Sequence, residues 1–139
     1  MQHPELDELR LHHTGCLTTD IKVACEQYGS LASSFEVSPV HTIAAQSVKV
    51  CFVGPSCGPF VEFVQPLSDS GSLANMIRKG IRFYHTGYLC GDIELSSRQL
   101  EEAGWRQVNK FSSEAFGGCP CAFFLSQDGL LIELIEARR

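Results

Sequence analysis

The sequence lacks several features that mark common classes of protein. It contains no CxxC pair, and its seven cysteines are an odd number, so neither a zinc ribbon nor a complete disulfide framework is indicated. Lys and Arg number 11 against 16 Asp and Glu, and the net charge of −5 argues against a nucleic-acid partner. The longest apolar runs, such as CAFFL, are too short to span a bilayer, so we expect no membrane partner.

The first ten residues, MQHPELDELR, are acidic and do not resemble a signal peptide, so we expect a cytoplasmic protein. Thiols stay reduced in that compartment. We therefore expect the cysteines to be free and to act as small buried hydrophobic side chains. They stand at Cys16, Cys25, Cys51, Cys57, Cys90, Cys119 and Cys121.

Two motifs occur twice in the chain at nearly the same spacing. HTGCLTTDI begins at His13 and returns as HTGYLCGDI at His85, a spacing of 72 residues. VEFVQ, which contains Glu62, matches IELIE, which contains Glu133, at a spacing of 71 residues. Matching offsets indicate an internal duplication whose units each begin near a His and end near a Glu.

Hydrophobic periodicity and turn signals give the same order of elements in both halves. The first half has predicted strands at 11–17, 40–45, 47–53 and 60–64 and a helix at 21–32, which Thr19 and Asp20 can cap. The second half has predicted strands at 83–89, 105–111, 119–125 and 130–136 and a helix at 92–104. A short connecting helix is expected over 73–79. Hydrophobic residues make up 44% of the 139 residues, enough for one compact core.

We therefore predict an α+β fold in which a single domain over 1–139 contains two tandem βαβββ modules, at 9–67 and 81–137. Pseudo-twofold symmetry would bring their strands into a curved mixed sheet around a central cleft. His13, Glu62, His85 and Glu133 would then converge on its concave face. Because side chains alternate along a strand, His12 should point to the face opposite His13.

The four repeated side chains suggest a metal site. A carboxylate that interrupts an apolar strand is costly to bury unless it is paired or binds a cation. Two imidazoles and two carboxylates suit a divalent Zn, Ni, Co, Mn or Fe ion with open positions for water or substrate. Singly, each histidine fits a structural hydrogen-bonding role and each glutamate a solvent-facing edge position. The repetition favours the metal site.

At these motifs the chain resembles the vicinal oxygen chelate superfamily, also called the glyoxalase, bleomycin resistance and dioxygenase fold. The resemblance covers 11–136 and rests on HTGCLTTDI, VEFVQPLSDSGSLANMI, YHTGYLCGDIE, QLEEAGW and GLLIELIE. Within the superfamily the sequence is most similar to methylmalonyl-CoA epimerase and its relatives. The resemblance implies a glyoxalase-like fold and places His13, Glu62, His85 and Glu133 where the family has its four metal ligands. It also implies a homodimer.

A complete His-Glu-His-Glu set implies a metal-dependent isomerase or epimerase. Such an enzyme removes a proton next to a metal-polarised carbonyl of a small-molecule substrate, such as an acyl-CoA or a 2-oxo thioester. Glu133 and Glu62 are the candidate bases. A glyoxalase I-like lyase and a non-catalytic binding protein of the resistance or sequestration type are the alternatives. The resemblance to bacterial epimerases implies a further glutamate on the third strand, but SVKVCFV contains no acid.

Overall fold

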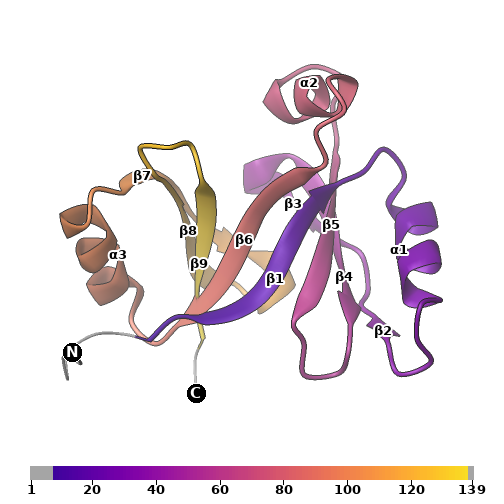
Figure 1. The fold of residues 1–139 in the computed structure, drawn as a ribbon, viewed down its shortest axis with the longest axis horizontal. Helices are drawn as coiled ribbons and strands as arrows, with labels where there is room; N and C mark the ends of the chain where they lie inside the picture. Colours follow the sequence, from indigo (N-terminus) through magenta and orange to yellow (C-terminus); the bar gives the residue numbers. More distant parts are fainter. Residues whose placement is uncertain (1–7, 138–139) are drawn as a thin grey trace. The chain divides into compact units, whose positions relative to one another are not determined.

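The computed structural model of the chain describes residues 8–137. Its described residues fold as two compact units, one formed by His12–Tyr84 and one formed by residues 85–137 with residues 8–11. Within the described residues there are three α-helices and nine strands (Figure 1). The predicted α+β class is confirmed, the second half has the predicted βαβββ order, and the first half has the same order with one additional short strand.

The elements of the first half span the colours from indigo to magenta in Figure 1. They are β1 (Arg10–Leu17), α1 (Ile21–Gly29), β2 (Glu36–Val37), β3 (His41–Ile43), β4 (Val48–Gly54), β5 (Phe60–Pro66) and α2 (Ser72–Arg78). The elements of the second half are β6 (Phe83–Cys90), α3 (Ile93–Glu102), β7 (Arg106–Ser113), β8 (Cys119–Leu125) and β9 (Leu131–Glu136).

Three local features differ from the sequence prediction. Helix α1 ends at Gly29 instead of residue 32, because the Leu31 N–H donates to the Tyr28 carbonyl and closes the last turn. The two-residue strand β2, which pairs with β4, was not predicted. Helix α2 begins and ends one residue earlier than the predicted range 73–79.

Strand pairing follows the same plan in both units. In the first unit the order is β2–β4–β5–β1, with β3 also paired to β4. Strands β1 and β5 are parallel, and β4 runs antiparallel to β5. In the second unit the order is β6–β9–β8–β7, in which β6 and β9 are parallel and β8 runs antiparallel to both β9 and β7. The glutamate-bearing strand of each unit therefore lies between one parallel and one antiparallel neighbour.

Each helix covers its own sheet with an apolar core. Helix α1 packs on β4 and β5, and helix α3 packs on β7, β8 and β9 (Figure 1). The core under α1 contains Ile21, Cys25, Cys51 and Val53, with Tyr28, Phe35 and Phe63 against it. The core under α3 contains Cys90, Ile93, Ala122, Phe124, Ile132 and Leu134, with Tyr88, Leu100 and Trp105 against it.

A second repeated contact ties each helix to the glutamate-bearing strand. The Ile21 N–H at the start of α1 donates to Gln65 Oε1 on β5 at 2.9 Å. At the start of α3, the Ile93 N–H donates to Glu136 Oε2 on β9 at 3.2 Å. Both acceptors are the polar residue that closes the repeated motif, in VEFVQ and in IELIE. This residue satisfies an N–H that a helix leaves unpaired at its first turn.

The cysteines agree with the prediction in most respects. All seven are free thiols, and Cys25, Cys51, Cys90 and Cys121 are buried. Cys57 is exposed, so the expectation of burial is wrong for that residue. Among residues 8–137, no helix combines the length and the apolar character needed to cross a lipid bilayer.

Burial, together with a hydrogen bond to Cys51 and its charge, raises the pKa of the Cys25 thiol to about 12. Only roughly one Cys25 side chain in 10,000 would be a thiolate at pH 8, and the thiolate is the nucleophile. We predict that iodoacetamide at pH 8 alkylates the exposed Cys57 and leaves Cys25 unmodified in the folded protein, as measured by peptide mass spectrometry. In guanidinium chloride Cys25 should react readily. Native labelling of Cys25 at the rate of Cys57 would refute the assignment.

Candidate functional site

The repeated glutamates lie on the sheet face opposite the helices. On β5, Phe63 packs in the core under α1, so the alternation of side chains directs its neighbour Glu62 to the other face. On β9, Ile132 and Leu134 pack in the core under α3, and Glu133 between them points away from it. The helix-packed cores thus fix the face on which both carboxylates lie.

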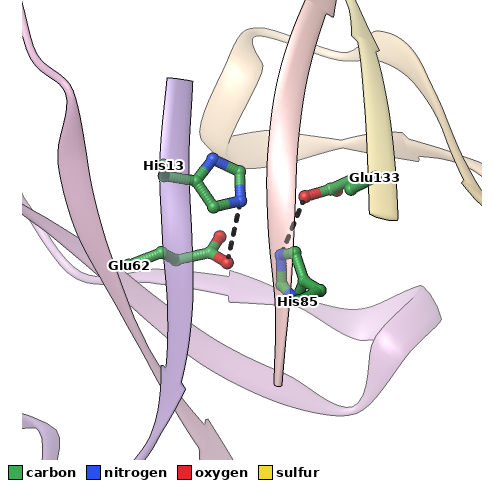
Figure 2. Close-up of side chains that lie close together, drawn as sticks. All are labelled: His13, Glu62, His85 and Glu133. Atoms are coloured by element: carbon green, nitrogen blue, oxygen red, sulfur yellow. Dashed lines mark ion pairs between the residues drawn. The ribbon is translucent and has the colours of Figure 1, made fainter. Parts of the chain in front are cut away.

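Glu62 lies next to His13 within the first unit. The Nε2 atom of His13 is 3.3 Å from Oε1 of Glu62, as the dashed line in Figure 2 shows. His13 is completely buried and Glu62 is 3% exposed. A carboxylate so deeply buried is costly without a partner, and the imidazole supplies one.

Glu133 lies next to His85 within the second unit in the same way. The distance from His85 Nε2 to Glu133 Oε1 is also 3.3 Å (Figure 2). The two residues are 1% and 4% exposed. The four predicted ligands therefore form two buried His–Glu pairs, one within each half of the duplication.

A glycine opposite each glutamate gives its side chain room. In the parallel pairing, Gly15 on β1 lies opposite Glu62 on β5, and Gly87 on β6 lies opposite Glu133 on β9. Each glycine follows its histidine by two residues, so a side chain there would extend from the same face as the histidine and the glutamate. The G of the repeated HTG motif keeps this space open.

A phenylalanine lies on the other side of each glutamate. Phe52 on β4 pairs with Glu62, and its ring centroid is 5.4 Å from that of His13. Phe123 on β8 pairs with Glu133, and its ring meets the His85 ring edge-on at 5.0 Å. The apolar rings keep water away from each pair. The sequence analysis missed them, although each lies ten residues before its glutamate and 71 residues from the other.

His12 does not follow the prediction that it would point away from His13. Its Nδ1 atom lies 2.8 Å from the Nδ1 atom of His13, and the two rings are nearly perpendicular. The His12 ring also meets Phe52 and Phe60 at 5.3 and 5.1 Å. The prediction was based on the alternation of Cβ directions along a strand. The imidazole extends beyond Cβ, so its ring can still reach the ring of the neighbouring histidine.

The thiol of Cys16 is affected by the charge of Glu62 in the first pair. Burial raises the pKa of its thiol, and the negative charge of Glu62 raises it further. Both effects favour the protonated thiol over the thiolate.

Most of the chain is similar to a known protein family. Residues 12–123 match the Glyoxalase/Bleomycin resistance protein/Dioxygenase superfamily. No curated relative matches the sequence. Among solved structures, a hypothetical protein from Bacillus halodurans superposes with a TM-score of 0.80 at 24% identity, covering 95% of this chain and 96% of its own.

Two similar structures are methylmalonyl-CoA epimerases. The enzyme from Mycobacterium tuberculosis has a TM-score of 0.81 at 21% identity, and the match covers 100% of this chain and 94% of that one. The Streptomyces coelicolor enzyme, in complex with 2-nitronate-propionyl-CoA, has a TM-score of 0.77 at 19% identity, covering 95% and 100%. At these identities the likeness establishes the glyoxalase-like fold, as the sequence predicted. With its duplicated βαβββ halves, the chain belongs to the glyoxalase, bleomycin resistance and dioxygenase superfamily.

Proposed function

We propose that this protein is a divalent-metal-dependent isomerase or epimerase. It removes a proton from the carbon next to a carbonyl group of a small acyl-CoA or 2-oxo thioester. The observation that carries the proposal is the occurrence of a buried His–Glu pair at matching positions of both halves. We further propose that His13, Glu62, His85 and Glu133 act together as the ligands of one metal ion.

The chemistry of the donors fits such an ion. Each of the four residues offers one ligand atom, two being imidazole nitrogens and two carboxylate oxygens. Mixed nitrogen and oxygen donors suit Co, Ni, Zn, Mn or Fe in the divalent state. All four residues are at least 96% buried, so a cation would also compensate the negative charge that the two glutamates bring into the interior.

The acyl-CoA class is supported by the structural neighbours. The Streptomyces coelicolor epimerase was solved with 2-nitronate-propionyl-CoA, and another related epimerase structure contains methylmalonyl-CoA. A metal-bound acidic pair in the same fold is suited to the same kind of proton removal. The proposal extends this substrate class to the present chain.

When bound, the metal would polarise the substrate carbonyl and lower the barrier to loss of the adjacent proton. Side chains of the protein would accept the proton and exclude water. The carboxylate of Glu133 or Glu62 would accept that proton, and return of the proton to the opposite face would complete an epimerisation. Phe52 and Phe123 would exclude water that could otherwise compete for the proton.

A non-catalytic binding protein is the second candidate, and strand β4 favours it. The resemblance to epimerases implies a glutamate on that strand, but β4 reads VKVCFVG and contains no acid. A chain that kept the fold without a complete proton-transfer set would bind a small molecule and leave it unchanged. The glyoxalase I-like lyase differs from the epimerase in the carbon that receives the proton. The cytoplasmic location and the homodimer stay predictions.

We predict near one divalent ion per chain in protein purified without chelators, measured by inductively coupled plasma mass spectrometry. Replacing one ligand of either half, in His13→Ala or His85→Ala, should remove the ion, because a single centre needs both pairs. Glu133→Ala should do the same. Circular dichroism should show that much of the fold remains, since Val, Phe, Leu and Ile side chains fill the cores.

His41→Ala, on β3, is the matched control and should keep the ion. Two ions per chain, or one ion retained when His85 alone is replaced, would show that each pair binds independently and would refute the single centre. A metal-free wild-type protein would favour the binding protein over the enzyme.

We predict that Gly87→Val weakens metal binding as strongly as loss of a ligand. A valine there would occupy the face between His85 and the opposing Glu133 and push the carboxylate away from the imidazole. Titration with Zn²⁺ measures the effect, and Thr86→Val, at the neighbouring position of β6 whose side chain extends from the other face, controls for a valine added to this strand. Unchanged affinity in Gly87→Val would show that the HTG glycine has no spatial role.

We predict that the metal-loaded protein exchanges the C2 proton of methylmalonyl-CoA for deuterium in deuterated water, as followed by proton NMR. General base catalysis contributes about 10²- to 10⁴-fold, so Glu133→Gln or Glu62→Gln should slow exchange by that factor. The variant that slows exchange while keeping the metal identifies the base. If the wild type exchanges no proton of this substrate although it binds metal, the acyl-CoA assignment is wrong.

A further inference from the structure

The residue that precedes the first metal ligand has a role that depends on the proposed metal site. His12 and His13 are neighbours in β1, and their Nδ1 atoms are 2.8 Å apart. A hydrogen bond between two such nitrogens requires a proton on one and a lone pair on the other. Because the Nε2 atom of His13 is the one that faces Glu62, it is the nitrogen available to a metal.

A neutral imidazole that binds a metal through Nε2 carries its proton on Nδ1. In the metal-bound protein, the Nδ1–H of His13 must therefore donate, and the Nδ1 atom of His12 must accept. We propose that His12 is a positioning residue that holds the His13 ring in this tautomer and orientation, with the Nε2 lone pair directed to the site. Metal-ligating histidines commonly donate their other N–H to a protein acceptor in this manner.

The His12 ring is itself held in place, which the role requires. It is partly buried, meets the Phe52 ring edge-on at 5.3 Å and lies against Phe60 at 5.1 Å. Phe52 also packs against His13, so one ring supports both members of the hydrogen bond. A side chain restrained on this side can fix its neighbour, whereas a mobile surface histidine could not.

The duplication places a different residue at the matching position of the second half. Tyr84 precedes His85 there, although the following HTG letters are the same. An imidazole in this place is therefore specific to the first half and is not required by the strand pairing that the two halves share. This difference assigns the His12 effect to His13 alone.

Two variants separate the hydrogen bond from ring packing. His12→Phe keeps an aromatic ring against Phe52 and Phe60 but has no nitrogen to accept a hydrogen bond. His12→Asn loses the ring but places an amide oxygen near the position of Nδ1. His41→Phe controls for the removal of a histidine elsewhere in the same unit. Thermal unfolding of the metal-free variants reports any effect on stability.

Isothermal titration with Zn²⁺ is the main measurement. Loss of such a partner of a metal ligand typically weakens binding about 10- to 100-fold, and we expect this for His12→Phe. His12→Asn should bind nearly as well as the wild type. If His12→Phe binds Zn²⁺ like the wild type and His12→Asn binds it more weakly, His12 acts only by packing and the proposal is wrong. Equal Zn²⁺ affinity of the wild type and both variants would also overturn it.

A spectroscopic readout on ¹⁵N-histidine-labelled protein does not depend on activity. In the metal-free wild type, a coupling between the Nδ1 nuclei of His12 and His13 should be visible across the hydrogen bond, and its absence would overturn the proposal. In the Zn²⁺-loaded form, His13 Nδ1 should have the chemical shift of a protonated nitrogen. A wild type that binds no Zn²⁺ refutes the metal site, and the positioning role with it. A wild type that binds with the affinity of His12→Phe refutes the positioning role alone.

Discussion

The structure is organised around the burial of a glutamate beside a histidine. A carboxylate removed from water costs several kcal/mol unless a partner compensates it. In each half the partner is an imidazole nitrogen 3.3 Å away, on the neighbouring parallel strand. Only a side chain two residues before the opposing glycine can reach this position, so strand register and chemistry are linked. A slip of β5 by one residue would turn Glu62 into the core under α1.

The remaining repeated residues serve this burial. The glycine of HTG leaves space beside the carboxylate, and a phenylalanine from the antiparallel neighbour shields it from water. The polar residue that ends each motif, Gln65 or Glu136, binds the first N–H of the helix that covers the other face. One short strand therefore carries a site residue on one face, core residues on the other and a helix contact at its end. Both copies of the motif combine these three tasks.

Much of this architecture follows from the sequence. The two repeats predict the βαβββ order, and the cost of a Glu inside an apolar strand predicts that each glutamate has a buried partner. In FVEFV and LIELIE at least one neighbour of each glutamate packs in the core under the helix. Such inferences succeed because strand periodicity and the cost of burying a charge depend on the order of residue types within a short segment.

Other features depend on hydrogen bonds and strand register that cannot be read from the amino-acid sequence. The early end of α1 is set by an i to i+3 bond after Gly29, and the pairing of β2 with β4 depends on tertiary contacts. Phe52 and Phe123 look like ordinary core residues until strand register places them opposite the glutamates. The prediction for His12 was wrong because strand alternation determines only the direction of the Cα–Cβ bond. The imidazole ring of His12 still reaches the ring of His13.

The two halves have diverged next to their His–Glu pairs. Here the first half has the His12 ring against His13, whereas the matching position of the second half holds Tyr84. The two glutamates therefore lie in different surroundings, although each faces a histidine at the same distance. Duplication explains why there are two His–Glu pairs, and the changed neighbours give the two pairs different environments within the same strand pairing.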